Sequence, residues 1–315
     1  MARPSAVYPP EIWAMESLLY LTRSQVVANL VHRNFEDEVA QKGDTVNTRL
    51  PTAGSIETIS NTVSNQVNFT AQAATNVAIV LDTHIATSFA VTDRDMSTSI
   101  KNLITEFVEP YTDPISEKVD DDLLGYLDDI DGTAGTSAYH TVTTSGVDLS
   151  LSDSSSLILG DFANIRGKLR ENKCPRISPD TVSIVLGTQH ETEALKIDNF
   201  IRVDTFGDNP PAMKTGYLTQ VYGMGVYADQ GVAKVGLKDV SVAFHRDAIA
   251  LVTRPLESPP VPTVTAASVS LNGVGMRAIM SYHHEQFATR MSYDILYGIK
   301  VLNFDLGCVL IDAVG

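Results

Sequence analysis

Three short clusters in the sequence contain the residue types that catalytic and metal sites use. The first is His245-Arg246-Asp247, which has the letters of a protein-kinase catalytic loop. It stands within an apolar, strand-like run from Phe244 to Val252, and the chain has no Gly-rich phosphate loop, strand lysine motif or Asp-Phe-Gly. We therefore interpret the cluster as part of a buried strand and expect no kinase activity.

The second cluster, Asp128-Asp129-Ile130-Asp131-Gly132, suggests a calcium-binding loop. In an EF-hand loop a glycine holds the sixth position, between carboxylate ligands at the first and twelfth. When Gly132 is placed there, the first position falls on Leu127 and the twelfth on Ala138, which have no carboxylate. The cluster is therefore predicted to be the solvated acidic end of a helix.

The third cluster, His283-His284-Glu285, could supply metal ligands, but neighbouring residues of a strand point to opposite faces. We expect a surface pair. Gly223-Met224-Gly225 is too short for a dinucleotide fingerprint and predicts a turn between strands, and the chain contains no Walker loop, nucleophile elbow or His-Glu-x-x-His pair. The sequence thus predicts no catalytic, cofactor-binding or metal-binding residue, and a protein that is not an enzyme.

The composition is that of a globular protein. Of 315 residues, 43% are hydrophobic and 19% are charged, which is enough to bury a core and excludes disorder of the whole chain. No apolar run is long enough to span a membrane, and Met1 to Ser5 lack the apolar core of a signal peptide. The two cysteines, Cys174 and Cys308, have no metal-site spacing and are expected to be buried thiols.

The charge is strongly acidic, with a net value of −15. There is no Lys or Arg between Arg49 and Arg94, and the segment from Asp93 to Asp131 has twelve acidic residues against three basic ones. Because a protein that grips nucleic acid needs clustered Lys and Arg, we expect no tight or sequence-specific DNA binding.

Apolar spacing of three to four residues predicts helices over about 11–32, 100–127, 154–172 and 188–198. The first has the expected buried stripe Ile12, Met15, Leu18, Leu19, Thr22, Val26 and Leu30. The second has an acidic outer face, with Asp120, Asp121, Asp122, Asp128, Asp129 and Asp131 expected in solvent, and Pro110 and Pro114 predict a kink or restart near 108–114.

Strands are predicted over about 44–50, 77–89, 181–187, 216–228 (a pair), 244–252, 274–283 and 294–311. The last is expected to join a central sheet beside 216–228 or 240–252. Between the first two lies a polar stretch from Ser55 to Thr75, which predicts either a long two-stranded excursion or a flexible surface loop. A two-stranded excursion cannot bury a face by itself and would have to lie against another subunit.

In this order and spacing, several segments resemble the major capsid proteins of tailed bacteriophages. The segments are Val31-His32-Arg33-Asn34-Phe35-Glu36 with Gly43-Asp44-Thr45-Val46 and Leu50-Pro51, Phe89 to Asp95, Lys214-Thr215-Gly216-Tyr217 through Tyr222-Gly223-Met224-Gly225-Val226-Tyr227, and the three C-terminal runs Phe244 to Val252, Gly275-Met276-Arg277 and Met291 to Leu302.

The resemblance implies an α+β fold, the tailed-phage capsid fold, in four parts. These are an N-terminal arm (1–43), an extended β-hairpin loop (44–83), a peripheral domain with a long spine helix (84–150 and 256–290) and an axial domain with a central sheet (151–255 and 291–315). The helix of the N-terminal arm is expected to lie on a neighbouring subunit, and the alternative is a core helix. Because the extended loop has hardly any Lys or Arg, we do not expect cross-linking through a loop lysine.

The resemblance also implies a function. The chain would assemble through pentamers and hexamers into an icosahedral shell around double-stranded DNA, bound without sequence specificity, with scaffolding, portal and decoration proteins as partners. It would have no cofactor and no membrane partner, and would be found in the virion capsid after assembly in the host cytoplasm. The alternatives are an encapsulin-like nanocompartment shell, a β-rich virion surface or adhesion protein, and an enzyme.

Overall fold

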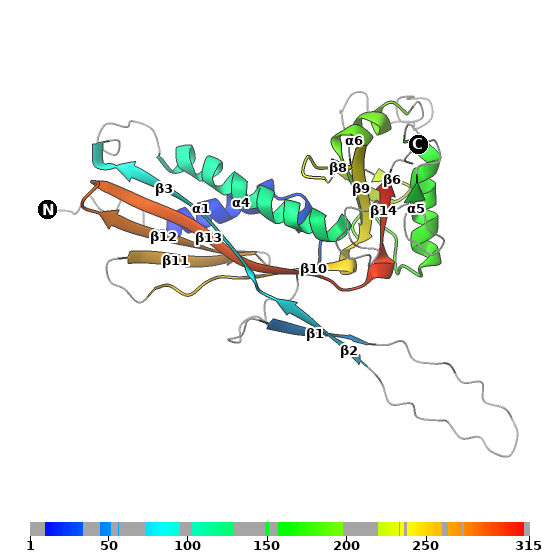
Figure 1. Cartoon of the computed structure of the whole chain (residues 1–315), viewed down its shortest axis with the longest axis horizontal. Coiled ribbons are helices and arrows are strands. Elements are labelled where there is room, and N and C mark those ends of the chain that lie inside the picture. Colours follow the sequence, from blue (N-terminus) through cyan, green and yellow to red (C-terminus); the bar gives the residue numbers. More distant parts are fainter. Residues whose placement is uncertain are drawn as a thin grey trace, which may run out of the picture.

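The structure is a computed structural model, and it describes residues 10–33, 45–51, 56, 74–94, 103–128, 149–150, 157–197, 220–232, 234–235, 238–259, 264–271 and 274–311. Within this part the molecule is elongated (Figure 1). A long sheet with two helices lies at one end, a second sheet with two further helices lies at the other, and a two-stranded ribbon projects from between them. The mixture of helices and mainly antiparallel sheets confirms the predicted α+β class.

The long sheet has five antiparallel strands around a central strand, β13. Its strands are β3 (Thr83–Thr92), β10 (Ile249–Arg254), β11 (Val264–Leu271), β12 (Val274–His283) and β13 (Ala288–Val301). Strand β13 pairs with β3 along one edge, and with β12 and then β10 along the other. Helices α1 (Pro10–Ser24) and α4 (Leu103–Asp128) cover one face of this sheet (Figure 1).

The second sheet, called the central sheet below, has seven strands in the order β4-β14-β9-β5-β7-β6, with β8 beside β9. Its strands are β4 (Leu149–Ser150), β5 (Val182–Leu186), β6 (Gln220–Val221), β7 (Met224–Ala228), β8 (Lys234–Val235), β9 (Lys238–His245) and β14 (Gly307–Ile311). Helices α5 (Leu159–Glu171) and α6 (Thr188–Leu195) pack against it. Every residue of β5 is buried, including the polar Ser183, as the mainly apolar sequence of this strand predicts.

The projecting ribbon consists of β1 (Thr45–Pro51) and β2 (Ala74–Val80), paired antiparallel, and is called the loop arm below. The two strands pair only with each other in the described part of the chain. The two-stranded excursion predicted for this region is confirmed at its base. The polar stretch between the strands lies outside the described residues, apart from Ile56.

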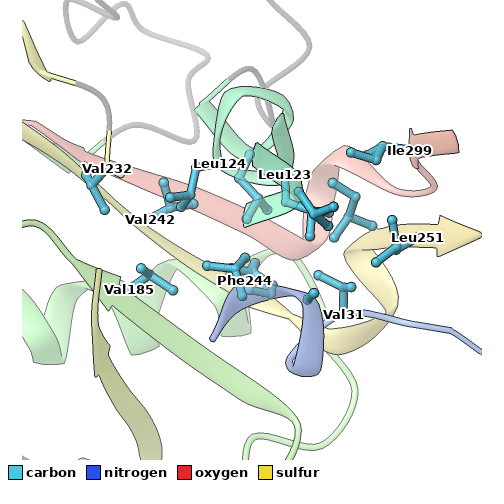
Figure 2. Close-up of a cluster of buried hydrophobic side chains, with 14 of the residues drawn as sticks. Val31, Leu123, Leu124, Val185, Val232, Val242, Phe244, Leu251 and Ile299 are labelled. Atoms are coloured by element: carbon cyan, nitrogen blue, oxygen red, sulfur yellow. The ribbon is translucent and has the colours of Figure 1, made fainter. Parts of the chain in front are cut away.

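The two sheets share one continuous hydrophobic core. Figure 2 shows the part where they meet: Leu123 and Leu124 of α4 lie among Val242 and Phe244 of the central sheet and side chains of the long sheet. A second, much smaller cluster consists of Val46, Ile79, Leu81, Ala250 and Val252. The large core unites the two sheets, whereas only the small cluster anchors the loop arm.

The N-terminal helix is shorter than predicted and buries a different face. Helix α1 ends at Ser24, and a separate 3-10 turn, η2, covers Val27–Asn29. The helix buries Trp13, Ala14, Ser17, Leu18 and Leu21. The prediction was right for Leu18 and wrong for the exposed Ile12, Met15 and Leu19. The buried face packs on α4, β11 and β12 of the same chain, so the prediction that this helix lies on a neighbouring subunit is wrong and α1 is a core helix of its own subunit.

The predicted restart of the acidic helix is wrong, since α4 runs as one continuous helix through Pro110 and Pro114. Both prolines are exposed. A proline leaves the carbonyl group one turn earlier without its N–H donor. Because that carbonyl lies on the same hydrated side of the helix, water can replace the donor and the helix continues. The predicted apolar stripe is confirmed for Val108, Ile115 and Val119, all buried.

Two C-terminal runs, each predicted as one strand, divide between the sheets. The run from Phe244 to Val252 contains the end of β9, a 3-10 turn, η3 (Arg246–Ala248), and the start of β10. The run 294–311 contains most of β13, a 3-10 turn, η4 (Phe304–Leu306), and β14. Pairing in the central sheet is confirmed for β14, which lies beside β9, and is wrong for β13, whose partner β10 belongs to the long sheet.

Candidate assembly surfaces

In the structure, the residue clusters that suggested catalytic or metal-binding chemistry have local structural roles. The backbone N–H of Asp247 donates to Nδ1 of His245 at 3.2 Å, which caps the turn η3 between the two sheets. Burial lowers the pKa of His245, while the nearby Asp247 carboxylate opposes this shift. Asp247 also lies 3.1 Å from Nδ1 of His32. The His-Arg-Asp letters therefore belong to a turn that redirects the chain.

The other candidates also lack a complete site. His283 ends β12 and His284 begins the following turn, so their rings stack with centroids 6.1 Å apart and do not point to opposite faces as predicted. Among the residues that the structure describes, no group of three or more His, Cys, Asp or Glu side chains could hold a metal. Residues 129–132, predicted to be the solvated acidic end of a helix, lie outside them.

The remaining sequence signals have structural explanations. Tyr222 and Gly223 form the predicted turn, between β6 and β7, with φ values of 48° and 74°. Cys174 and Cys308 are buried and form no disulfide, as expected, and burial raises the pKa of the Cys174 thiol. No described helix is long and apolar enough to cross a membrane.

The base of the loop arm lies against the face of the long sheet opposite to the helices. Val46 and Ile79 of the arm, with Leu81, pack on Ala250 and Val252 of β10. These β10 residues pair with Lys300 and Gly298 of β13 and share their face of the sheet. The arm thus leaves the molecule across a sheet face that no described helix covers.

The N-terminal segment is joined to α4 by a buried carboxylate. Asp120, predicted to face solvent, is only 6% exposed. Its two oxygens accept hydrogen bonds from the backbone N–H groups of Val26, at 2.8 Å, and Ala28, at 2.9 Å. Burial raises the pKa of Asp120 to about 6, although these hydrogen bonds act in the opposite direction. The prediction was wrong here because a donor-rich turn 92 residues away covers this carboxylate.

The exposed side of α4 is acidic, as predicted. Glu109, Glu117 and Asp121 are exposed, and Lys118 beside them forms an ion pair with Asp122 at 2.6 Å. Asp121, Asp229, Asp120 and Glu117 line a surface pocket of about 440 Å³. Desolvation, followed by repulsion from Asp229, raises the pKa of Asp121. The helix therefore presents negative charge to whatever faces it.

A charged network crosses three strands on the face of the long sheet that no described helix covers, which is called the open face below. Arg277 of β12 donates two hydrogen bonds to the Asp294 carboxylate of β13, at 3.0 and 2.5 Å. His84 of β3 lies 3.0 Å from the same carboxylate. Asp294 is only 4% exposed, so its charge is neutralised inside the sheet. The network holds the register of β3, β13 and β12.

Among the exposed apolar side chains of the described residues are two groups whose exposure the sequence did not reveal. Ile12, Met15 and Leu19 form a stripe on α1 opposite to its buried face, at 49%, 45% and 39% exposure. At the turn between β12 and β13, Phe287 is 68% exposed with a φ of 47°. The helical spacing of the first three residues was visible in the sequence, but their direction was not.

A comparison with protein families gives this architecture its identity. The sequence model of a family described as phage capsid protein matches residues 74–283, more than half of the chain. The chain belongs to this phage capsid protein family. Its role is accordingly that of a structural protein of a capsid shell. The match extends from the second strand of the loop arm through α4 to the end of β12.

Solved structures share the fold of this capsid protein. One from Mycobacterium phage Che8 is 20% identical, with a TM-score of 0.63 and coverage of 91% of this chain and 90% of that chain. The cyanophage Pam1 capsid asymmetric unit is 10% identical, with a TM-score of 0.61 and the same coverage. The asymmetric unit of the bacteriophage PhiM1 mature capsid is 11% identical, with a TM-score of 0.56 and coverage of 85% and 82%.

These similarities confirm the expected tailed-phage capsid fold. Their low identities carry no further detail of function. Among curated proteins, none matches the chain significantly.

Proposed function

We propose that this chain is the major capsid protein of a tailed phage and assembles through pentamers and hexamers into an icosahedral shell. One observation carries the proposal: the loop arm has a ribbon pairing of its own but only a small apolar cluster at its base. A two-stranded ribbon is at best marginally stable in water. The arm therefore needs a surface on a neighbouring subunit, and a ring of such contacts can close around a symmetry axis.

Within such a shell, we assign the long sheet with α1 and α4 to the peripheral domain and the central sheet with α5 and α6 to the axial domain. The loop arm, which leaves the subunit across the face of the long sheet that no described helix covers, would reach one neighbouring subunit. On the other face of the long sheet, the exposed apolar stripe of α1, which includes Ile12 and Met15, would provide a further contact surface. Several such contacts, totalling about 800–2,000 Å² per subunit pair, would hold the shell together without covalent links.

We further propose that the shell encloses double-stranded DNA without sequence-specific binding. The exposed acidic side of α4, with Glu109, Glu117 and Asp121, would face the lumen and repel phosphates over about 8 Å at physiological salt. DNA could then enter and pack without adhering. Changing these three residues to Lys should leave assembly intact and trap nucleic acid, read as a higher ratio of absorbance at 260 nm to that at 280 nm in purified particles.

The remaining parts of the proposal concern partners and place. Scaffolding, portal and decoration proteins would associate with the shell, which would form in the host cytoplasm and remain in the virion. The subunit would perform no catalysis and need no cofactor. An encapsulin-like nanocompartment has less support, because the family match is to phage capsid proteins; packaged genomic DNA in native particles would distinguish a phage capsid from a shell filled with enzymes.

The decisive test replaces the distal part of the arm. Because Pro51 pairs with Ala74, residues 52–73 can be exchanged for an Asn-Gly turn that closes the ribbon directly. We expect a folded subunit with unchanged circular dichroism that forms no closed particles by electron microscopy and sedimentation. Normal shells from this variant would overturn the role of the arm in assembly. The control is wild-type protein purified in parallel, which should form shells.

A further inference from the structure

Gly298 lies directly against the backbone at the base of the loop arm. It lies in β13, paired with Val252 of β10. A Cβ atom built on Gly298 would lie 2.1 Å from the carbonyl oxygen of Val80, 2.9 Å from its carbonyl carbon and 3.2 Å from Cα of Leu81. Real Cβ atoms essentially never come within 3.0 Å of a heavy atom outside their own residue and its chain neighbours. All three neighbours are backbone atoms, which cannot rotate away as a side chain could.

The contact lies at the end of the arm strand β2, which terminates at Val80. Beyond it, β3 begins at Thr83, opposite Tyr297, and runs along β13 as part of the long sheet. After the contact, the chain is held by the pairing of β3 with β13. At the contact and just before it, the chain is held by the small cluster that includes Leu81 and Ile79. Any residue larger than glycine at position 298 would therefore have to displace the arm, because the paired strand β3 is the more firmly held side.

We propose that Gly298 is a positioning residue for assembly: the missing side chain sets the direction in which the loop arm leaves the subunit. The seven residues of β2 span about 20 Å at roughly 3.3 Å each, so a small rotation at the base becomes a larger displacement at the far end. Direction matters only if the arm contacts a neighbour, so the consequence for shells rests on the proposed function, while the effect on direction does not.

The test measures the direction of the arm in full-length, unassembled subunits. Nitroxide labels at Asn76→Cys on the arm and Ala90→Cys on β3, both exposed positions, give a distance distribution by pulsed electron resonance. In Gly298→Ala we expect the mean distance to shift by about 2 Å or more, given the length of the ribbon. A second label pair, Ala90→Cys with Ala163→Cys on α5, lies on the body and should not change.

A matched control is Gly167→Ala in α5, where an added Cβ meets nothing within 4 Å and should leave both distances unchanged. An arm distance in Gly298→Ala equal to that of wild type would overturn the proposal. If Gly298→Ala does not fold, Ile79→Ala removes part of the anchor without creating a clash and should broaden the arm distribution. An unchanged distribution in that variant would show that the arm is firmly held without this cluster, which would overturn the premise that the arm is the side displaced by a residue larger than glycine at position 298.

Shell formation provides a separate readout. Gly298→Ala should give open or irregular particles by electron microscopy, while Gly167→Ala should give normal ones. A shifted arm with normal particles would support Gly298 as the residue that sets the direction and contradict the proposed use of the arm in closure. The two ideas can therefore fail independently.

Discussion

The phenol group of Tyr297 in β13 donates a hydrogen bond of 2.5 Å to the carboxylate of Asp122 in α4. Tyr297 is only 1% exposed, so this bond ties the helix to the central strand of the long sheet from inside. Desolvation, followed by the hydrogen bond to Asp122, raises the pKa of the phenol above its ordinary value. The sheet and its acidic helix are thus joined by polar as well as apolar contacts.

Tyr297→Phe should therefore destabilise the subunit. The substitution keeps the ring and removes one hydrogen bond to a charged group, which is worth about 1.5–3 kcal/mol. Urea unfolding at pH 7.5 measures the loss. Tyr282→Phe is the matched control, because its hydroxyl donates to Asp93 at the surface, and it should change little. Equal stability of Tyr297→Phe and wild type would show that the buried bond contributes nothing.

The pH dependence of stability should carry a contribution from Asp120. Its folded pKa of about 6 lies above the ordinary value of 3.8 for an Asp carboxyl, so the folded state binds this proton more tightly than the unfolded state. The stabilising contribution of protonation is complete below about pH 4 and is lost as the pH rises through 6. On acidification from pH 7 to 5, Asp120 should thus favour folding by roughly 1 kcal/mol per pH unit at most.

Asp120→Asn removes this titration and isolates it from other groups. Urea unfolding of both proteins at pH 7.5, 6.0 and 5.0 should give a stability difference that grows in favour of wild type as the pH falls. The variant should also be less stable throughout, because one amide oxygen cannot replace two carboxylate oxygens that accept from Val26 and Ala28. A difference that is constant over this range would contradict the assignment.

The network on the open sheet face should behave as a coupled unit. Asp294→Ala leaves Arg277, whose side chain is 15% exposed, without its carboxylate partner. Removing one member of a buried pair costs about 3–5 kcal/mol, whereas replacing both by apolar residues is often nearly neutral. We expect Asp294→Leu combined with Arg277→Met to be more stable than Asp294→Ala alone. Thermal unfolding that ranks the double variant below the single one would refute the coupling.

Truncation should distinguish the two strands of the C-terminal run. A chain ending at Asn303 retains β13 but loses β14, which pairs with both β4 and β9 in the central sheet. Removing it exposes the edge of β9 and its apolar neighbours, so we expect aggregation, measured by sedimentation. A monodisperse product with native circular dichroism would mean that the central sheet does not need β14.

Sequence periodicity by itself determined the elements whose burial is uniform along their length. The fully buried β5 and the stripe of α4 through Ile115 and Val119 could be predicted, since each repeats one local pattern. The order of the segments was also enough to identify the family and its fold.

Only the tertiary structure decided which partner each segment meets. Asp120 looked like its acidic neighbours, and its burial depends on the N–H groups of a turn far away in the chain. The division of 294–311 between two sheets depends on the turn at Phe304–Leu306, which the apolar run does not reveal. Gly298 was visible as a glycine, but its role follows from a backbone contact with Val80, which is 218 residues earlier. Local patterns specify the elements, whereas long-range packing specifies their neighbours.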